Sequence, residues 1–150
     1  MTRALRIASA LLAACSLFAS SALARPPGGD FNGDGKRDLA IGVPGESVSG
    51  VGGAGAVCVI YGSASGLAAS GNALISTADL GYPLEESARF GTAVAVGDFD
   101  GDGFDDAAVG APHRSVGAID GAGEVYVVFG SINGLDATRS QRWNQDSPKI

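Results

Sequence analysis

The strongest constraint on the fold of this chain is an internal repeat. Shifting the sequence against itself by 68 residues, with no gap, aligns residues 30–82 with residues 98–150, and 21 of these 53 positions are identical. A fixed period of this kind is typical of repeat architectures, in which each copy buries its apolar face against a neighbour. The matched residues include Asp30, Phe31, Gly33, Asp34, Gly35, Asp38, Gly42 and Pro44, which recur as Asp98, Phe99, Gly101, Asp102, Gly103, Asp106, Gly110 and Pro112.

Each copy reads as short strands separated by turns. The runs at 55–62 (GAVCVIYG) and 123–130 (GEVYVVFG) are the strongest strand signals; in the second copy, residues 92–99 enter an Asp-rich segment and residues 106–112 leave it. A weaker strand is expected around Trp143 and its counterpart Ile75. The 24 glycines gather at the ends of these runs, and no helical periodicity of useful length follows the N-terminal segment. We therefore expect an all-β chain.

The Asp-rich segments, DFNGDGKRD at 30–38 and DFDGDGFDD at 98–106, predict two metal loops. Oxygen ligands at loop positions one, three, five and nine converge, and at an effective dielectric near 20 each close pair of carboxylates costs on the order of 4 kcal/mol, which a cation offsets. An all-oxygen set favours Ca²⁺. The expected ligands are Asp30, Asn32, Asp34, Asp38 and the Lys36 carbonyl in the first loop, and Asp98, Asp100, Asp102, Asp106 and the Phe104 carbonyl in the second.

These loops are not EF-hands. Ile41 and Val109 stand where an EF-hand has its bidentate glutamate, and the flanking segments are strands. Four carboxylates predict tighter binding at the second loop, and Asp105 is expected to point to solvent. The alternative is a pair of Asp/Gly turns without metal, since these residues are common in turns.

The N-terminus predicts export. Residues 1–24 combine two arginines, an uncharged run of Ala, Leu and Ser, and a small-residue cleavage site ending at Ala24, which is typical of a signal peptide. Two alternatives are an uncleaved membrane anchor and a lipoprotein with Cys15 as its lipidated first residue.

Charge and cysteine content narrow the function. The net charge is −6, so we expect no nucleic-acid partner. The two loops hold 8 of the 16 acidic residues, so most of this negative charge is explained by the predicted metal sites. After cleavage Cys58 is the remaining cysteine, which we expect to be buried and inert; an intermolecular bridge is the alternative.

The order of motifs in the second copy resembles the FG-GAP repeat of integrin α-chains and of many secreted bacterial proteins. Phe90 and Gly91 open the copy, the Asp loop follows, and Gly110, Ala111 and Pro112 close it. The resemblance implies a four-stranded β-propeller blade, with Ca²⁺ held between its first and second strands. It also implies a non-enzymatic role in cell adhesion or extracellular ligand binding.

The first copy departs from this pattern. It has Gly42, Val43 and Pro44 in place of Gly-Ala-Pro and lacks its own Phe-Gly pair. The sequence holds two copies of the repeat, whereas a propeller needs at least four blades. We therefore expect about two blades and an incomplete ring. Residues 25–97 would hold the first repeat, a partial blade, and the start of the second blade; residues 98–150 would hold the remainder. Further blades of a longer chain, or other copies, would complete the ring.

Other residues add no catalytic motif. His113 follows a proline and is expected to be an exposed loop residue, whereas Tyr61, Tyr126 and Phe129 lie in strand runs and are expected to pack in the core. A sugar-stacking platform that includes Trp143 is the alternative. We therefore expect an exported, calcium-binding module that holds about two ions, located in the extracellular medium or at the cell surface. The alternatives are a secreted lectin and an accessory domain of a longer secreted hydrolase.

Overall fold

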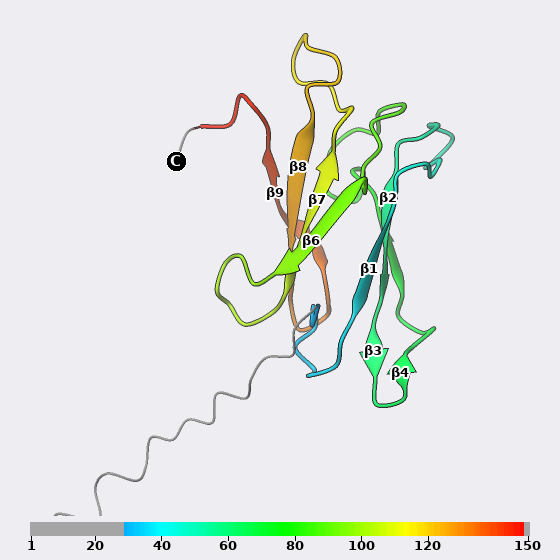
Figure 1. Cartoon of the computed structure of the whole chain (residues 1–150), viewed down its shortest axis with the longest axis vertical. Helices are drawn as coiled ribbons and strands as arrows, with labels where there is room; N and C mark the ends of the chain where they lie inside the picture. The colour runs from blue at the N-terminus through cyan, green and yellow to red at the C-terminus, as the bar shows by residue number, and fades with distance from the viewer. Residues whose placement is uncertain (1–28, 149–150) are drawn as a thin grey trace, which may run out of the picture.

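The computed structural model describes residues 29–148 and is built from strands (Figure 1). No helix occurs in this part of the chain, which confirms the all-β prediction. The predicted signal peptide, with Cys15 and Ala24, lies outside the described residues. The strands are β1 (Leu39–Val43), β2 (Ala56–Ile60), β3 (Gly62–Ser63), β4 (Gly66–Leu67), β5 (Ala73–Ile75), β6 (Ala93–Gly97), β7 (Asp106–Ala111), β8 (Glu124–Phe129) and β9 (Asp136–Trp143).

The second copy forms a four-stranded antiparallel sheet in the order β6-β7-β8-β9. Each strand pairs with the next one along the chain, because short turns connect antiparallel neighbours. The register sets Val94 opposite Val109, Val109 opposite Tyr126, and Tyr126 opposite Arg142. Since side chains alternate across a sheet, these residues share one face.

The first copy forms a three-stranded antiparallel sheet in the order β1-β2-β5. These strands correspond to β7, β8 and β9, as the 68-residue repeat predicts. A separate two-stranded ribbon, β3-β4, was not predicted. Over residues 29–148 the sheets do not close into a ring, in agreement with the expected incomplete propeller. No helix in this part of the chain is long and apolar enough to cross a membrane.

The core lies between the two larger sheets, which stand face to face in Figure 1. Val57 and Val59 of β2 contribute from the first sheet, and Tyr126 of β8 contributes from the second. Phe31 and Phe90, both fully buried, fill the space between the sheets. The Tyr126 ring meets Phe90 edge to face, with centroids 5.5 Å apart. One core therefore joins the two copies.

Several side chains of the strand runs are less buried than expected. Cys58 is half-buried instead of buried, because strand alternation turns it away from the face that carries Val57 and Val59. Tyr61 and Phe129 are also half-buried, so of the three aromatic residues expected in the core only Tyr126 is fully buried. 

His113 is exposed, as predicted.

A buried polar cluster joins β8 to the segment before β6. The Arg114 guanidinium lies 3.1 Å from a Glu85 carboxylate oxygen and 3.6 Å from one of Glu124. The Tyr126 hydroxyl donates a hydrogen bond to Glu124. Burial, together with this hydrogen bond, raises the pKa of Tyr126. Every buried charge of the cluster has a partner, which is the condition for burying ions at tolerable cost.

Candidate metal centre

Each Asp loop is adjacent in sequence to strands of one of the two larger sheets. The second loop connects β6 to β7, and the first leads into β1. Gly35 and Gly103, at loop position six, have φ of +76° and +99°, a left-handed conformation that glycine adopts without the steric cost of a Cβ. Each loop therefore turns sharply enough to point several side-chain oxygens inward.

In the second loop, three carboxylates come together. One oxygen from each of Asp98, Asp100 and Asp106 lies within 4.8 Å of the others. Asp106 is fully buried beneath the loop. It accepts hydrogen bonds from the Phe99 N–H at 2.6 Å and the Gly130 N–H at 2.8 Å, which hold it in place. The loop thus has a fixed inner carboxylate and two outer ones.

Arg139 of β9 lies against the outer edge of this loop, which the sequence analysis did not predict. Its guanidinium is 3.1 Å from an Asp100 oxygen and 3.6 Å from an Asp102 oxygen. Asp102, the predicted ligand outside the close group of three, also accepts a hydrogen bond from the Phe104 N–H at 3.0 Å. The first copy has Gly71 at the position that corresponds to Arg139. The two loops therefore differ in their surroundings as well as in their ligands.

The first loop has a similar set of hydrogen bonds from backbone N–H groups to its own side-chain oxygens. Asp30 accepts from the N–H groups of Asp34 at 3.0 Å and Gly35 at 3.1 Å, and Asn32 accepts from Asp34 at 3.1 Å. Asp34 accepts from the Lys36 N–H at 2.7 Å. The side-chain oxygens at positions one, three and five are thus all turned into the loop.

Asp38 closes the first loop as Asp106 closes the second. It is buried and accepts hydrogen bonds from the Phe31 N–H at 2.7 Å and the Gly62 N–H at 2.8 Å. Burial raises the pKa of Asp38, and the nearby carboxylates of Asp34 and Asp30 raise it further, whereas the two N–H donors lower it. A cation would relieve both effects that raise this pKa.

Asp105 contradicts the sequence-based prediction. It was expected to point to solvent, but it is 7% exposed, and one of its carboxylate oxygens accepts a hydrogen bond from the Asp30 N–H at 2.8 Å. The Asp105 N–H in turn donates to the Asp30 carbonyl at 3.0 Å. The Phe104 ring also packs against Gly33. The two loops are therefore in direct contact.

The donor chemistry fits a hard divalent cation. The side-chain ligands predicted for both loops are oxygens, and a cation among three carboxylates would offset their mutual repulsion. The predicted backbone ligands, the carbonyls of Lys36 and Phe104, remain predictions, as does the complete set of ten ligand residues.

A four-stranded antiparallel sheet with an Asp-rich loop between its first two strands, repeated in part within the same chain, defines a β-sheet repeat protein, and comparison with known proteins gives the family. The FG-GAP repeat family matches residues 26–60 and 90–128. The chain belongs to the FG-GAP repeat family. Its sheets are therefore β-propeller blades.

Several relatives share this module. Phosphatidylinositol-glycan-specific phospholipase D of Mus musculus is 43% identical over 105 residues, which are 70% of this chain and 12% of the relative. Integrin alpha-PS3 of Drosophila melanogaster is 36% identical over 119 residues, 79% of this chain and 10% of the relative. Integrin alpha-4 of Xenopus laevis is 38% identical over 114 residues, 75% of this chain and 10% of the relative. The chain thus spans about an eighth or less of the length of these relatives.

Proposed function

We propose that this chain is an exported, non-enzymatic FG-GAP module that binds about two Ca²⁺ ions and serves in cell adhesion or in binding an extracellular protein or glycan. The observation that carries the calcium assignment is the approach of Asp98, Asp100 and Asp106 to within 4.8 Å. The integrin relatives support the adhesive role. The N-terminal signal-like segment supports export, with a location in the medium or at the cell surface.

In this proposal the calcium ions have a structural role. Each ion would bind a loop that joins or precedes strands of one blade, and the buried Asp38 and Asp106 would anchor the ion to the sheet through their hydrogen bonds to Gly62 and Gly130. Because the ion binds the folded loops in preference to the unfolded chain, it would stabilise the fold by mass action. The surface that meets the ligand would then be held in one conformation.

A second candidate function follows from the phospholipase D relatives. Their names describe enzymes, and the chain matches 12–13% of each of them. An accessory module of a longer secreted hydrolase is therefore the alternative, with catalysis in residues beyond the matched region. A lectin is a further alternative, which binding to a glycan array would distinguish from protein adhesion.

The test is a calorimetric titration of Ca²⁺ into chelator-treated protein. We expect about two ions to bind, one in the Asp98→Asn variant, and one in the Asp30→Asn variant. Asp146→Asn serves as the matched control, because Asp146 is an exposed acid outside the loops. Unchanged stoichiometry in both loop variants, or no binding by the wild type, would refute the calcium assignment.

A further inference from the structure

The chain has four asparagines, and two of them precede a glycine. The pair Asn32-Gly33 lies in the first Asp loop, and the pair Asn133-Gly134 lies in the turn between β8 and β9. Because glycine has no Cβ, its backbone nitrogen can reach the side-chain carbonyl carbon of the preceding asparagine. Such a pair can deamidate by an intramolecular reaction, whose rate depends on how the fold holds the two groups.

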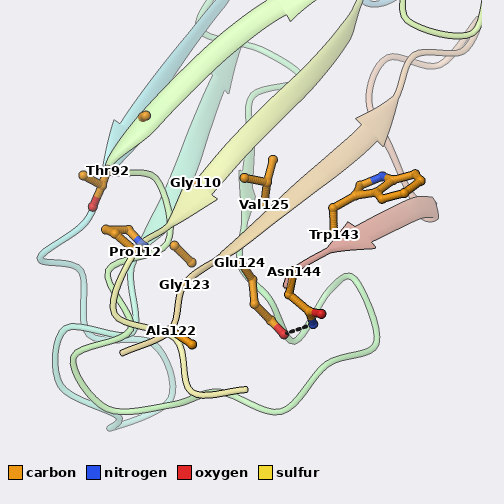
Figure 2. A pocket seen from close by; sticks show the side chains of 11 residues that line it. Thr92, Gly110, Pro112, Ala122, Gly123, Glu124, Val125, Trp143 and Asn144 are labelled. Carbon is orange, nitrogen blue, oxygen red and sulfur yellow. Dashed lines mark hydrogen bonds between the residues drawn. The ribbon is translucent and has the colours of Figure 1, made fainter. Parts of the chain in front are cut away.

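The other two asparagines are held by hydrogen bonds from their side-chain amides. The Asn144 amide donates to a Glu124 carboxylate oxygen at 2.9 Å, and both residues line a pocket of about 450 Å³ on the second sheet (Figure 2). The Asn72 amide donates to the Ala69 carbonyl at 3.1 Å. Neither asparagine is followed by glycine, so the reaction is expected at neither position.

The backbone nitrogen of Gly134 is held by the fold. Its N–H donates to the Ser131 carbonyl at 2.8 Å, and Gly134 is buried against the Tyr61 side chain. Before this nitrogen can attack a carbon, it must leave the hydrogen bond and lose its proton, which burial hinders. The fold therefore protects Asn133, although the Asn133 side chain itself is exposed.

The Asn32-Gly33 pair has the opposite arrangement. Within residues 29–148 the Gly33 N–H donates to no acceptor, and Gly33 is exposed. The Asn32 side-chain oxygen accepts the Asp34 N–H at 3.1 Å. That donor would stabilise the negative charge that develops on the oxygen when the Asn32 side-chain carbon is attacked. The attacking nitrogen is thus accessible, and the carbonyl that it attacks is polarised.

We propose that Asn32 is a deamidation site of the folded chain. The Gly33 nitrogen loses its proton to solvent and bonds to the Asn32 Cγ, and the bond from Cγ to Nδ2 breaks, so that ammonia leaves. Water then opens the cyclic imide. Cleavage of the bond between the Gly33 nitrogen and Cγ gives aspartate, and cleavage at the main-chain carbonyl carbon gives isoaspartate. The reaction consumes one water, releases one ammonia and needs no other reactant.

Each product would change the first loop. Aspartate at position 32 would give this loop four side-chain carboxylates, as in the second loop, which has Asp100 at the equivalent position. Isoaspartate would lengthen the backbone before Gly33, which packs against the Phe104 ring, and would disturb the contact between the loops. An effect of aspartate on calcium affinity rests on the proposed function, whereas the modification itself does not.

The test compares the two Asn-Gly pairs within one chain. Chelator-treated protein is incubated in mildly alkaline buffer made with water enriched in heavy oxygen, which labels each new carboxylate. Trypsin then places Asn32 and Asn133 on separate peptides, because it cleaves after Lys36 and Arg114. Mass spectrometry measures the labelled fraction of each peptide. The same chain in denaturant is the control, since both pairs are then free of the fold.

We expect Asn32 to deamidate faster than Asn133 in the folded protein by on the order of 5-fold or more, the factor that one backbone hydrogen bond provides. In denaturant the two rates should approach each other. Equal rates in the folded protein, a faster reaction at Asn133, or no labelling of Asn32 would overturn the proposal. So would a difference of the same size in denaturant, since the local sequence and not the fold would then cause it.

Discussion

At the scale of single residues, the contact between the two Asp loops depends on Asp105. Its carboxylate accepts the Asp30 N–H at 2.8 Å, and both residues are buried. The sequence could not reveal this role, because the two residues are 75 positions apart and Asp105 occupies a loop position that carries no ligand. By contrast, loop spacing alone predicts that the oxygens at positions one, three and five turn inward, as they do in the first loop. Their role as metal ligands stays a prediction.

We expect Asp105→Ala to reduce the free energy of unfolding by about 1–3 kcal/mol, the cost of leaving a buried donor without its acceptor. Asp105→Asn should lose less, because its amide oxygen can still accept the Asp30 N–H. Denaturant unfolding of both variants in saturating calcium would measure the loss. Equal stability of the Ala variant and the wild type would contradict the assigned role.

The second prediction concerns the effect of Arg139 on the calcium affinity of the second loop. Its guanidinium pairs with Asp100 and Asp102, and its side chain is 48% exposed. An exposed pair of this kind contributes about 0.2–1 kcal/mol, so Arg139→Gln should raise the calcium affinity of the second loop by at most about 5-fold, through loss of a competing positive charge. Arg139→Lys keeps the charge and serves as the matched control. Calorimetry with the first loop disabled by Asp30→Asn would isolate the effect, and lower affinity in the Gln variant would count against it.

At the scale of elements, β8 was the most predictable strand, because its run of β-branched and aromatic residues lies between Gly123 and Gly130. Strand β9 is largely polar, and the sequence therefore predicted it only as a weaker strand around Trp143. The ribbon β3-β4 was not predicted, since strands of two residues carry no periodicity. The half-burial of Cys58 was also missed, because an apolar run such as β2 does not show which of its faces meets another sheet. The position of Arg139 depends on the pairing of β8 with β9, which only the folded register gives.

The packing of one sheet on the next gives a matched pair of glycine variants. Gly42→Ala would force its Cβ into the Gly91 carbonyl oxygen, whereas Gly110→Ala would place its Cβ 3.6 Å from the Ala93 Cβ. We expect the first to lower the free energy of unfolding by about 1–3 kcal/mol or more, as overpacking does. The second should stay near the wild type. Thermal melts of the two variants would decide, and similar losses in both would refute this account of the interface.

At the scale of the whole molecule, the loops, the sheets and the core form one connected structure. The first loop contacts the second through Asp30 and Asp105, Phe31 lies in the core between the sheets, and the Ser131 N–H donates to the Phe31 carbonyl at 3.2 Å. We therefore expect a change at one loop to reach the other through a short path of buried contacts. If both loops bind calcium, binding at one should then favour binding at the other.

Calcium removal tests this connection. At a free calcium concentration 100 times the dissociation constant, each site should add about 2.7 kcal/mol to the free energy of unfolding, which a chelator removes. If the loops are coupled, Asp98→Asn should also weaken binding at the first loop, because its neighbour is then less ordered. Replacing Asp105 by alanine in that variant should add little further weakening, since the contact that transmits the effect is already impaired. Titration of the single and double variants would measure the coupling free energy; additive losses would show that the two loops bind independently.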